Sequence, residues 1–338
     1  MRTIVLEEPG RFVRGDTESP GAIPNGHARV RVHRVGICGS DLHAYRGRQP
    51  FFSYPRIVGH ELGVEVLEVA PDVQGLAPGG RCAVEPYLNC GTCIACKRGK
   101  TNCCAELEVM GVHVDGGMRE EIVVPADKLH ASATLSDDQL ALVETLGIGA
   151  HAVGRANPRP DESVLVMGAG PIGLSVIQFA QVTGAQVIVV ELSAQRLAFC
   201  RDQFGVGHAV DGNDQPLEHV REILNGDLPE VVFDATGSPA SMMTAFDYVA
   251  NGGRLTLVGL VQSDITFFDP EFHRRELTLL SSRNAVGGDL SRVIGLMERG
   301  EIDTGPWITH RTDYDSLIEE FPALLEPEQG LVKAIMCM

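Results

Sequence analysis

The stretch VLVMGAGPIGLSVIQFAQVTGAQVIVVE, residues 164–191, decides the fold of a large part of this chain. Gly168, Gly170 and Gly173 form the pattern G-x-G-x-x-G directly after an apolar strand, and Glu191 ends the next strand. The first glycine allows a tight turn, the second lets backbone approach a pyrophosphate, and the third lets a helix pack on the sheet. Because strand, helix and acid stand in register, the stretch predicts a dinucleotide-binding βαβ unit.

The same region has the length and apolar character of a transmembrane helix, because residues 163–190 contain no charged side chain and are long enough to cross a bilayer. Pro171 and Gly184 join the three glycines of the fingerprint in cutting this run into strand, turn, helix, turn and strand. Such a pattern is typical of segments buried inside an α/β domain. We therefore expect no membrane association.

Glu191 also indicates the cofactor. Its carboxylate is expected to accept hydrogen bonds from the adenosine ribose hydroxyls and to repel a 2′-phosphate, which predicts NAD over NADP. Arg196 follows soon after and leaves an alternative open, because it could contact the adenine side or a phosphate, or lie solvated on a helix. Positions at strand ends place further residues beside the cofactor: Ile172, Thr236, Val258, Gly259 and Leu260.

The chain divides into segments with different sequence patterns. From residue 1 to about 143, short β-prone runs such as HARVRVHRVG alternate with Gly and Pro, as in a partly open β-barrel. From about 161 to 280, apolar strands alternate with helix-length segments, which predicts a doubly wound parallel sheet. The final LVKAIMCM is a strand too isolated to form a domain, so we expect it to return to the first one. The predicted limits are 1–146, 147–284 and 285–338.

Composition restricts the partners. The chain has 338 residues with 28 Lys plus Arg against 45 Asp plus Glu, a formal net charge of −17, which argues against binding nucleic acid or anionic membranes. The N-terminal MRTIVLEEPG has no apolar segment of a signal peptide, so a cytoplasmic location is expected. Small molecules are the expected partners.

A second informative stretch is NCGTCIACKRGKTNCC, residues 89–104. Its thiols stand at spacings that let one loop wrap four sulfurs around a zinc ion at about 2.3 Å. Disulfides or an iron–sulfur cluster are the alternatives, and Cys103 could replace Cys104 as the fourth ligand. Since thiols in a chain without secretory features usually bind metal, we predict a closed structural zinc site in a lobe over about 88–106, with the ligands Cys90, Cys93, Cys96 and Cys104.

Two further clusters precede this lobe: GICGSDLH, residues 36–43, and VGHE, residues 58–61. With the cysteine lobe and GAGPIG, in this order and spacing over nearly the whole chain, they resemble the zinc-dependent medium-chain alcohol dehydrogenase family. The resemblance implies a GroES-like catalytic domain beside a Rossmann domain, NAD as cofactor, and two zinc ions per chain. It also implies a homodimer or homotetramer.

By this resemblance, Cys38 and His60 hold a catalytic zinc, and Glu61 and Glu144 ligate it directly or through water. Thr145 stands where related polyol-type enzymes commonly have proline, and Glu144 could instead be a surface carboxylate at a helix start. Glutamate at this position distinguishes the polyol-like branch from simple-alcohol enzymes, which place cysteine there. Asp41 is expected to orient His60.

The arrangement implies a chemistry. A zinc-bound alcohol has its hydroxyl pKa lowered, so an alkoxide can form and pass hydride to the nicotinamide ring. By resemblance, Ser40 takes the proton and relays it through the nicotinamide ribose to His43, whose near-neutral pKa suits transfer to solvent. Either residue could instead have a structural role.

The expected substrate is a polar secondary alcohol. Within the family, the segments around Glu144 and SSRNAVGG look most like dehydrogenases of polyols, threonine and sugar acids such as L-galactonate or L-gulonate. Arg46 and Arg283 are candidates to pair with a substrate carboxylate, although they could equally form interdomain ion pairs or contact the cofactor. The alternatives are an L-threonine 3-dehydrogenase type, a simple-alcohol enzyme, or a non-catalytic nucleotide-binding member of the fold.

Overall fold

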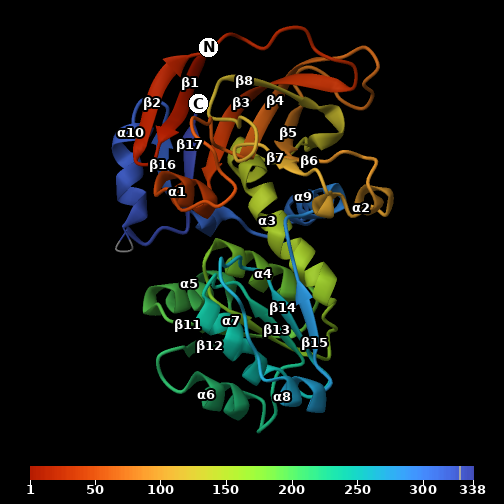
Figure 1. Cartoon of the computed structure of the whole chain (residues 1–338), viewed down its shortest axis with the longest axis vertical. Helices are drawn as coiled ribbons and strands as arrows, with labels where there is room; N and C mark the ends of the chain where they lie inside the picture. The colour runs from red at the N-terminus through yellow and green to blue at the C-terminus, as the bar shows by residue number, and fades with distance from the viewer. Residues whose placement is uncertain (327–328) are drawn as a thin grey trace. The chain divides into compact units, whose positions relative to one another are not determined.

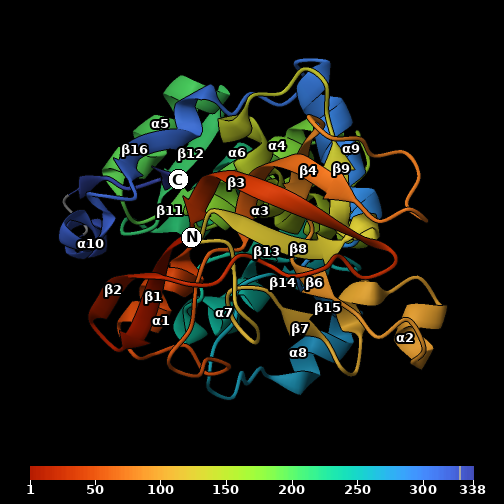
Figure 2. The same cartoon turned by 90° about the horizontal axis from the view of Figure 1, so that it is seen from above.

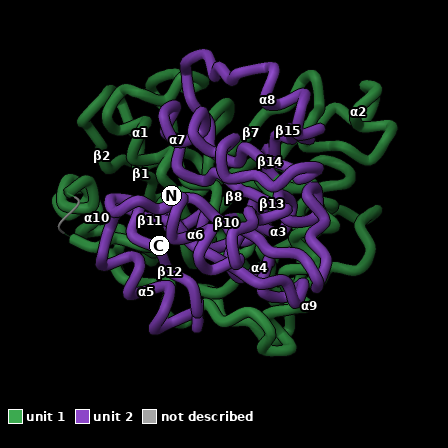
Figure 3. Tube along the Cα trace, turned by 90° about the horizontal axis from the view of Figure 1, so that it is seen from below, with its two compact units in different colours: residues 1–144, 285–338 green, residues 145–284 purple. Residues whose placement is uncertain are grey.

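The computed structural model describes residues 1–326 and 329–338, which form two compact units (Figure 3). The first unit comprises 1–144 and 285–338, and the second comprises 145–284. Helix α3 (Asp137–Ala156) begins in the first unit and ends in the second. Within the described ranges, no helix has the length and apolar character needed to cross a membrane.

A seven-stranded sheet forms the centre of the first unit, in the order β16-β17-β3-β4-β5-β9, with β8 also pairing with β3 (Figures 1 and 2). The C-terminal strand β17 therefore lies antiparallel to β3. The strands are β3 (His27–Ile37), β4 (Glu61–Val69), β5 (Arg81–Val84), β8 (Glu121–Pro125), β9 (Leu129–Ala131), β16 (Ile308–Asp313) and β17 (Lys333–Cys337).

Side chains alternate between buried and less buried along β3, so one face of this strand packs on the core. Ala28, Val30 and Val32 are buried in the core, while Arg31 between them is exposed. Each fully buried valine contributes about 1.5–3 kcal/mol relative to an exposed one. The other strands and α-helices of this unit are β1 (Arg2–Glu8), β2 (Arg11–Asp16), α1 (Gly39–Tyr45), β6 (Tyr87–Leu88), α2 (Ile94–Lys97), β7 (Glu108–Val109), α9 (Gly287–Glu298) and α10 (Leu317–Glu320).

The second unit contains a six-stranded parallel sheet in the order β12-β11-β10-β13-β14-β15, so the strand order reverses between β10 and β13. This is the doubly wound order of a Rossmann domain, which binds its ligand at the reversal. The strands are β10 (Ser163–Met167), β11 (Gln186–Glu191), β12 (His208–Asp211), β13 (Val231–Asp234), β14 (Arg254–Leu257) and β15 (Thr278–Ser281). The helices are α4 (Pro171–Val182), α5 (Ala194–Phe204), α6 (Pro216–Ile223), α7 (Pro239–Thr244) and α8 (Asp269–Arg274).

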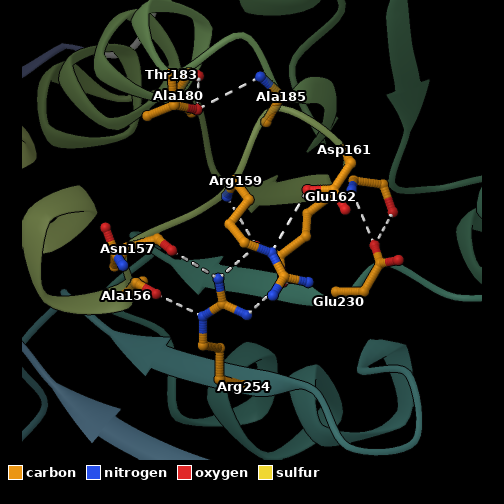
Figure 4. Close-up of polar contacts among 11 residues, drawn as sticks. Ala156, Asn157, Arg159, Asp161, Glu162, Ala180, Thr183, Ala185, Glu230 and Arg254 are labelled. Atoms are coloured by element: carbon orange, nitrogen blue, oxygen red, sulfur yellow. Dashed lines mark hydrogen bonds and ion pairs between the residues drawn. The ribbon is translucent and has the colours of Figure 1, made fainter.

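Charged groups tie together the amino-terminal edge of this parallel sheet (Figure 4). Arg254 at the start of β14 forms a bidentate pair with Glu162, at 2.9 and 2.6 Å, just before β10. Glu230, just before β13, accepts hydrogen bonds from the backbone N–H and hydroxyl of Ser163 at 2.8 and 2.6 Å. The carboxyl ends of the same strands, where ligands bind in this fold, lie at the opposite edge.

Candidate functional site

The glycine fingerprint forms the turn between β10 and α4. Gly168 has φ +90, a conformation that favours glycine, and a Cβ on Gly173 would lie only 1.9 Å from the carbonyl oxygen of Gly168. A Cβ on Gly170 would meet only Nη1 of Arg196, at 3.8 Å. The backbone at Gly170 is therefore open at the amino-terminal end of α4, which fits a dinucleotide pyrophosphate.

Glu191 lies beside this turn at the end of β11. Its carboxylate accepts backbone hydrogen bonds from Ala169 at 2.7 Å, Leu192 at 2.8 Å and Ser193 at 2.9 Å. Nη1 of Arg196 lies 4.0 Å from the same carboxylate. The structure thus brings together the glycine turn, the acid and the arginine that the sequence analysis singled out.

The other expected cofactor residues also follow carboxyl ends of β10, β13 and β14: Ile172, Thr236, Val258, Gly259 and Leu260. The hydroxyl of Thr236 donates to the Asp234 carboxylate at 2.7 Å, which orders the turn after β13. A Cβ on Gly259 would lie 2.7 Å from the backbone N of Gly237, so the turns after β13 and β14 pack closely. These residues all lie at the edge where a Rossmann sheet binds its cofactor.

In the first unit, Cys38, His60 and Glu61 form a compact group in which the possible ligand atoms all lie within 4.8 Å of one another. Cys38 follows β3 as the residue preceding α1, and Glu61 is the first residue of β4. Because β3 and β4 are antiparallel, with Gly36 opposite Glu61, the end of one strand meets the start of the other. Strand pairing therefore places two motifs that are separate in sequence at one point.

The surroundings of this group favour a bound cation. Asp41 accepts a hydrogen bond from the backbone N–H of Cys38 at 2.9 Å, and its other oxygen lies 3.9 Å from Nδ1 of His60. Among the described residues, this buried Nδ1 has no hydrogen-bond partner. Burial alone would lower the pKa of His60, but the charges of Cys38 and Asp41 raise it well above the ordinary value. A thiol, an imidazole and carboxylates that converge in this way suit zinc.

Glu144 lies close by on α3 but outside the three-residue group. Its carboxylate is buried and accepts a hydrogen bond from the hydroxyl of Tyr87. Burial raises the pKa of Glu144, and the negative charge of Glu61 adds to the increase, while His60 opposes it. Tyr87 was not among the expected site residues, because a lone tyrosine before the cysteine lobe carries no recognisable signal.

Lys333 is a second residue beside the metal site that the sequence analysis did not predict. It begins β17, and its Nζ lies 2.6 and 2.8 Å from the two carboxylate oxygens of Glu61. The two residues are 272 positions apart. The one hint in the sequence is a single charged residue at the start of the otherwise apolar strand KAIMC.

The proposed proton-relay residues lie on α1. The hydroxyl oxygen of Ser40 is buried and has no partner among the described residues. The side chain of His43 is exposed, and partial burial together with the charges of Arg46 and Arg48 lowers its pKa. Arg46 donates from Nη2 to the carbonyl oxygen of Leu325 at 2.7 Å, so its guanidinium already has a partner in the chain.

The second candidate arginine, Arg283, is exposed and lies in the second unit, just after β15. Arg46 belongs to the first unit, on the turn that ends α1. The two guanidinium groups therefore start from different structural units, and their pairing with a substrate carboxylate stays a prediction.

The cysteine lobe presents its four thiols as one group: Cys90, Cys93, Cys96 and Cys104. All nine cysteines of the chain are free, and Cys103 is exposed and outside this group. Hydrogen bonds from Thr92 and from backbone lower the pKa of Cys90 to about 6, which favours its thiolate. Cys104 accepts backbone hydrogen bonds from Cys90 and Glu106, both at 3.3 Å. Such thiolate-favouring contacts fit a tetrahedral zinc site.

Comparisons with known proteins find relatives over nearly the whole chain. Residues 24–134 match the alcohol dehydrogenase GroES-like domain, and residues 171–299 match the zinc-binding dehydrogenase family. The chain is 37% identical over 337 residues to an L-galactonate-5-dehydrogenase of Escherichia coli, covering 99% of this chain and 98% of that protein. It is 33% identical over 330 residues to a D-altritol 5-dehydrogenase of Agrobacterium fabrum, with 95% of each covered.

Among solved structures, the fold is similar to an Escherichia coli protein described as a short chain alcohol dehydrogenase complexed with the cofactor NADH. The TM-score is 0.93 at 30% identity, covering 100% of this chain and 99% of that one.

Proposed function

The chain belongs to the zinc-dependent medium-chain alcohol dehydrogenase family, and we propose that it oxidises a secondary alcohol of a sugar acid or polyol with NAD as hydride acceptor. The observation that carries the proposal is the group of Cys38, His60 and Glu61, because a thiol, an imidazole and a carboxylate suit a catalytic zinc. The glycine turn and Glu191 support the nucleotide half of the reaction.

Cys38 and His60 would hold the zinc, with Glu61 and Glu144 as the available carboxylates. Bound there, zinc supplies a Lewis acid that acidifies an alcohol hydroxyl, and the reaction yields a ketone, NADH and one proton. The unpartnered hydroxyl oxygen of Ser40 is suited to accept that proton. His43 is exposed, and its lowered pKa favours the neutral form, which can accept the proton and pass it to water.

The choice of NAD over NADP rests on Glu191. Its carboxylate is held by three backbone N–H groups at the position where a ribose 2′-phosphate would meet negative charge. Arg196 beside it is a cation that would favour NADP. Comparable kcat/KM values with the two cofactors would contradict this part of the proposal.

The substrate class rests on the relatives, which are described as L-galactonate and D-altritol 5-dehydrogenases. The test is NADH formation by zinc-loaded protein with a panel of aldonates, neutral polyols, L-threonine and simple alcohols. We expect the highest kcat/KM with an aldonate or polyol. A preference for threonine or a simple alcohol would contradict the substrate class, and no turnover with any of them would contradict the proposed reaction.

A further inference from the structure

A buried ion pair lies directly beside the candidate catalytic metal site. The Nζ atom of Lys333 contacts both carboxylate oxygens of Glu61, at 2.6 and 2.8 Å, and the carbonyl oxygen of Ile37 at 3.4 Å. The side chains of Lys333 and Glu61 are 2% and 0% exposed. Buried charges of this kind persist when they are paired, so each of these two groups determines the position of the other.

The central strand β3 leaves room for the contact between Glu61 and Lys333. Glu61 lies on β4 and Lys333 on β17, and β3 lies between these strands. On β3, Gly36 pairs with Glu61 on one side and with Ile335 on the other. Ile335 is two residues after Lys333, so the two side chains lie on the same face of β17. A Cβ at Gly36 would lie 2.1 Å from Oε2 of Glu61. The missing side chain therefore lets the carboxylate reach across β3 to the ammonium group.

Glu61 is shared between this ammonium and the metal site, since its carboxylate also belongs to the group with Cys38 and His60. Glu144 differs, because its hydrogen-bond donor is the neutral hydroxyl of Tyr87. The positive charge of Lys333 beside Glu61 reduces the negative charge that Glu61 offers to a metal ion, and it repels the ion itself. A catalytic zinc must keep one position open for substrate.

We propose that Lys333 is a positioning residue that competes with the catalytic metal for Glu61 and thereby keeps a coordination position open for the alcohol. This rests on the proposed function in taking Cys38 and His60 as metal ligands. Glu144, which accepts from a neutral phenol and not from an ammonium, is then the firmer carboxylate ligand. Lys333 acts through Glu61 and does not itself contact the reacting atoms.

The test replaces the charge and keeps the apolar stem, as Lys333→Met. Cobalt is titrated into protein that retains zinc in its four-cysteine site, with Cys38→Ala as the reference that lacks the catalytic thiolate. In Lys333→Met, Glu61 should bind the metal fully, so affinity rises by about tenfold or more. The visible cobalt absorption should weaken as coordination number rises, and kcat should fall because the open position is filled.

The matched control is Lys128→Met, which removes another buried lysine of the same unit that pairs with Glu85 at 2.6 Å. It should leave the cobalt spectrum of the catalytic site unchanged. An equal change in both variants would overturn the proposal, and so would wild-type affinity and spectrum in Lys333→Met. Absence of a thiolate-to-cobalt band in the unmodified chain would instead contradict the proposed function.

A double variant keeps the test decisive if Lys333→Met does not fold. Replacing both partners of a buried pair is much less costly than replacing one, so Glu61→Gln with Lys333→Met is expected to fold. In the Glu61→Gln background the lysine has no carboxylate to withhold. The cobalt spectrum should then be the same with and without Lys333→Met, because the lysine can act on the ion there only by charge repulsion, and a weakened absorption from the lysine change in this background would show that it acts independently of Glu61.

Discussion

The carboxylates around the candidate metal site have different partners, and this separates their roles. Glu61 pairs with an ammonium, Glu144 accepts from a phenol, and Asp41 accepts from a backbone N–H. Burial raises the pKa of Asp41, and the negative charge of Glu61 adds to the increase, while His60 opposes it. Chemically similar groups in one small volume are thus distinguished by what donates to them.

The pKa of His43, the expected last residue of the proton relay, depends on nearby arginines. The positive charges of Arg46 and Arg48 contribute to its lowered pKa, so its neutral form persists to lower pH. In Arg48→Met, the pKa of His43 should rise, and the acid limb of the kcat profile should move to higher pH by a few tenths of a unit. The measurement is kcat against pH at low and high salt, because screening should reduce the difference. An unchanged profile would argue against His43 as the relay.

Strand ends and the turns that follow them carry most of the candidate chemistry. The end of β3 and the start of β4 supply Cys38, His60 and Glu61, and β17 adds Lys333. In the parallel sheet, the expected cofactor residues lie at the strand ends, turns and helix starts that follow β10, β11, β13 and β14. Regular strands hold the ends of these segments in place, while the turns have backbone and side chains available for ligands.

The assignment of Cys104 as a zinc ligand in the cysteine lobe can be tested directly. Cys104→Ala should lose one zinc ion per chain and unfold at lower temperature, because a structural zinc site contributes folding free energy. Cys103→Ala is the matched control, since Cys103 is exposed and outside the four-thiol group. Zinc content measured by mass spectrometry, together with the melting temperature, shows which of the two cysteines is the zinc ligand. Equal zinc loss in the two variants would contradict the assignment.

The ion pair at the amino-terminal edge of the parallel sheet predicts a pH dependence. The hydrogen bond from Arg254 lowers the pKa of Glu162, so the pair stabilises fully above the ordinary glutamate pKa and less as pH falls through the lowered value. Arg254→Met should therefore reduce the free energy of unfolding at pH 7 by about 2–4 kcal/mol.

The loss from Arg254→Met should shrink at acidic pH, where Glu162 is protonated in both proteins. Urea unfolding at several pH values measures it. The control is Arg274→Met, which breaks an exposed pair with Glu271 and should have no measurable effect. A loss that does not depend on pH would mean that packing, and not the ion pair, stabilises this edge.

Each of the two units contains one half of the proposed reaction: the candidate zinc sites lie in the first and the nucleotide turn in the second. The second unit also ends its sheet in a short edge strand, β15, of which Leu279 is 39% exposed. Phe268, 69% exposed, adds further apolar surface in this unit. Unpaired strand edges and exposed apolar groups commonly mark contacts between chains.

We therefore expect a homo-oligomer. Light scattering should give a dimer or tetramer of the 36.3 kDa chain, and Leu279→Lys should lower the measured mass by placing charge on the edge strand. Leu192→Lys, at a position 66% exposed on the turn after β11, serves as control. A monomeric mass for the unmodified chain at micromolar concentration would contradict the expectation.

The amino-acid sequence alone predicted the family, the fold class and the two zinc-dependent motifs, and the comparisons confirm the family and the fold class. These features are readable because their signals are local. A glycine turn after a strand, or four cysteines in one loop, places its groups by short-range geometry that the spacing itself specifies.

Only the tertiary structure decided which distant groups surround the metal site. Lys333 meets Glu61 across 272 positions of chain, through two antiparallel pairings and a strand that carries Gly36 between them. Tyr87, on the short strand β6, donates to Glu144 on α3, 57 positions away. No spacing rule connects such residues, because their proximity depends on strand register and packing, which the whole fold determines.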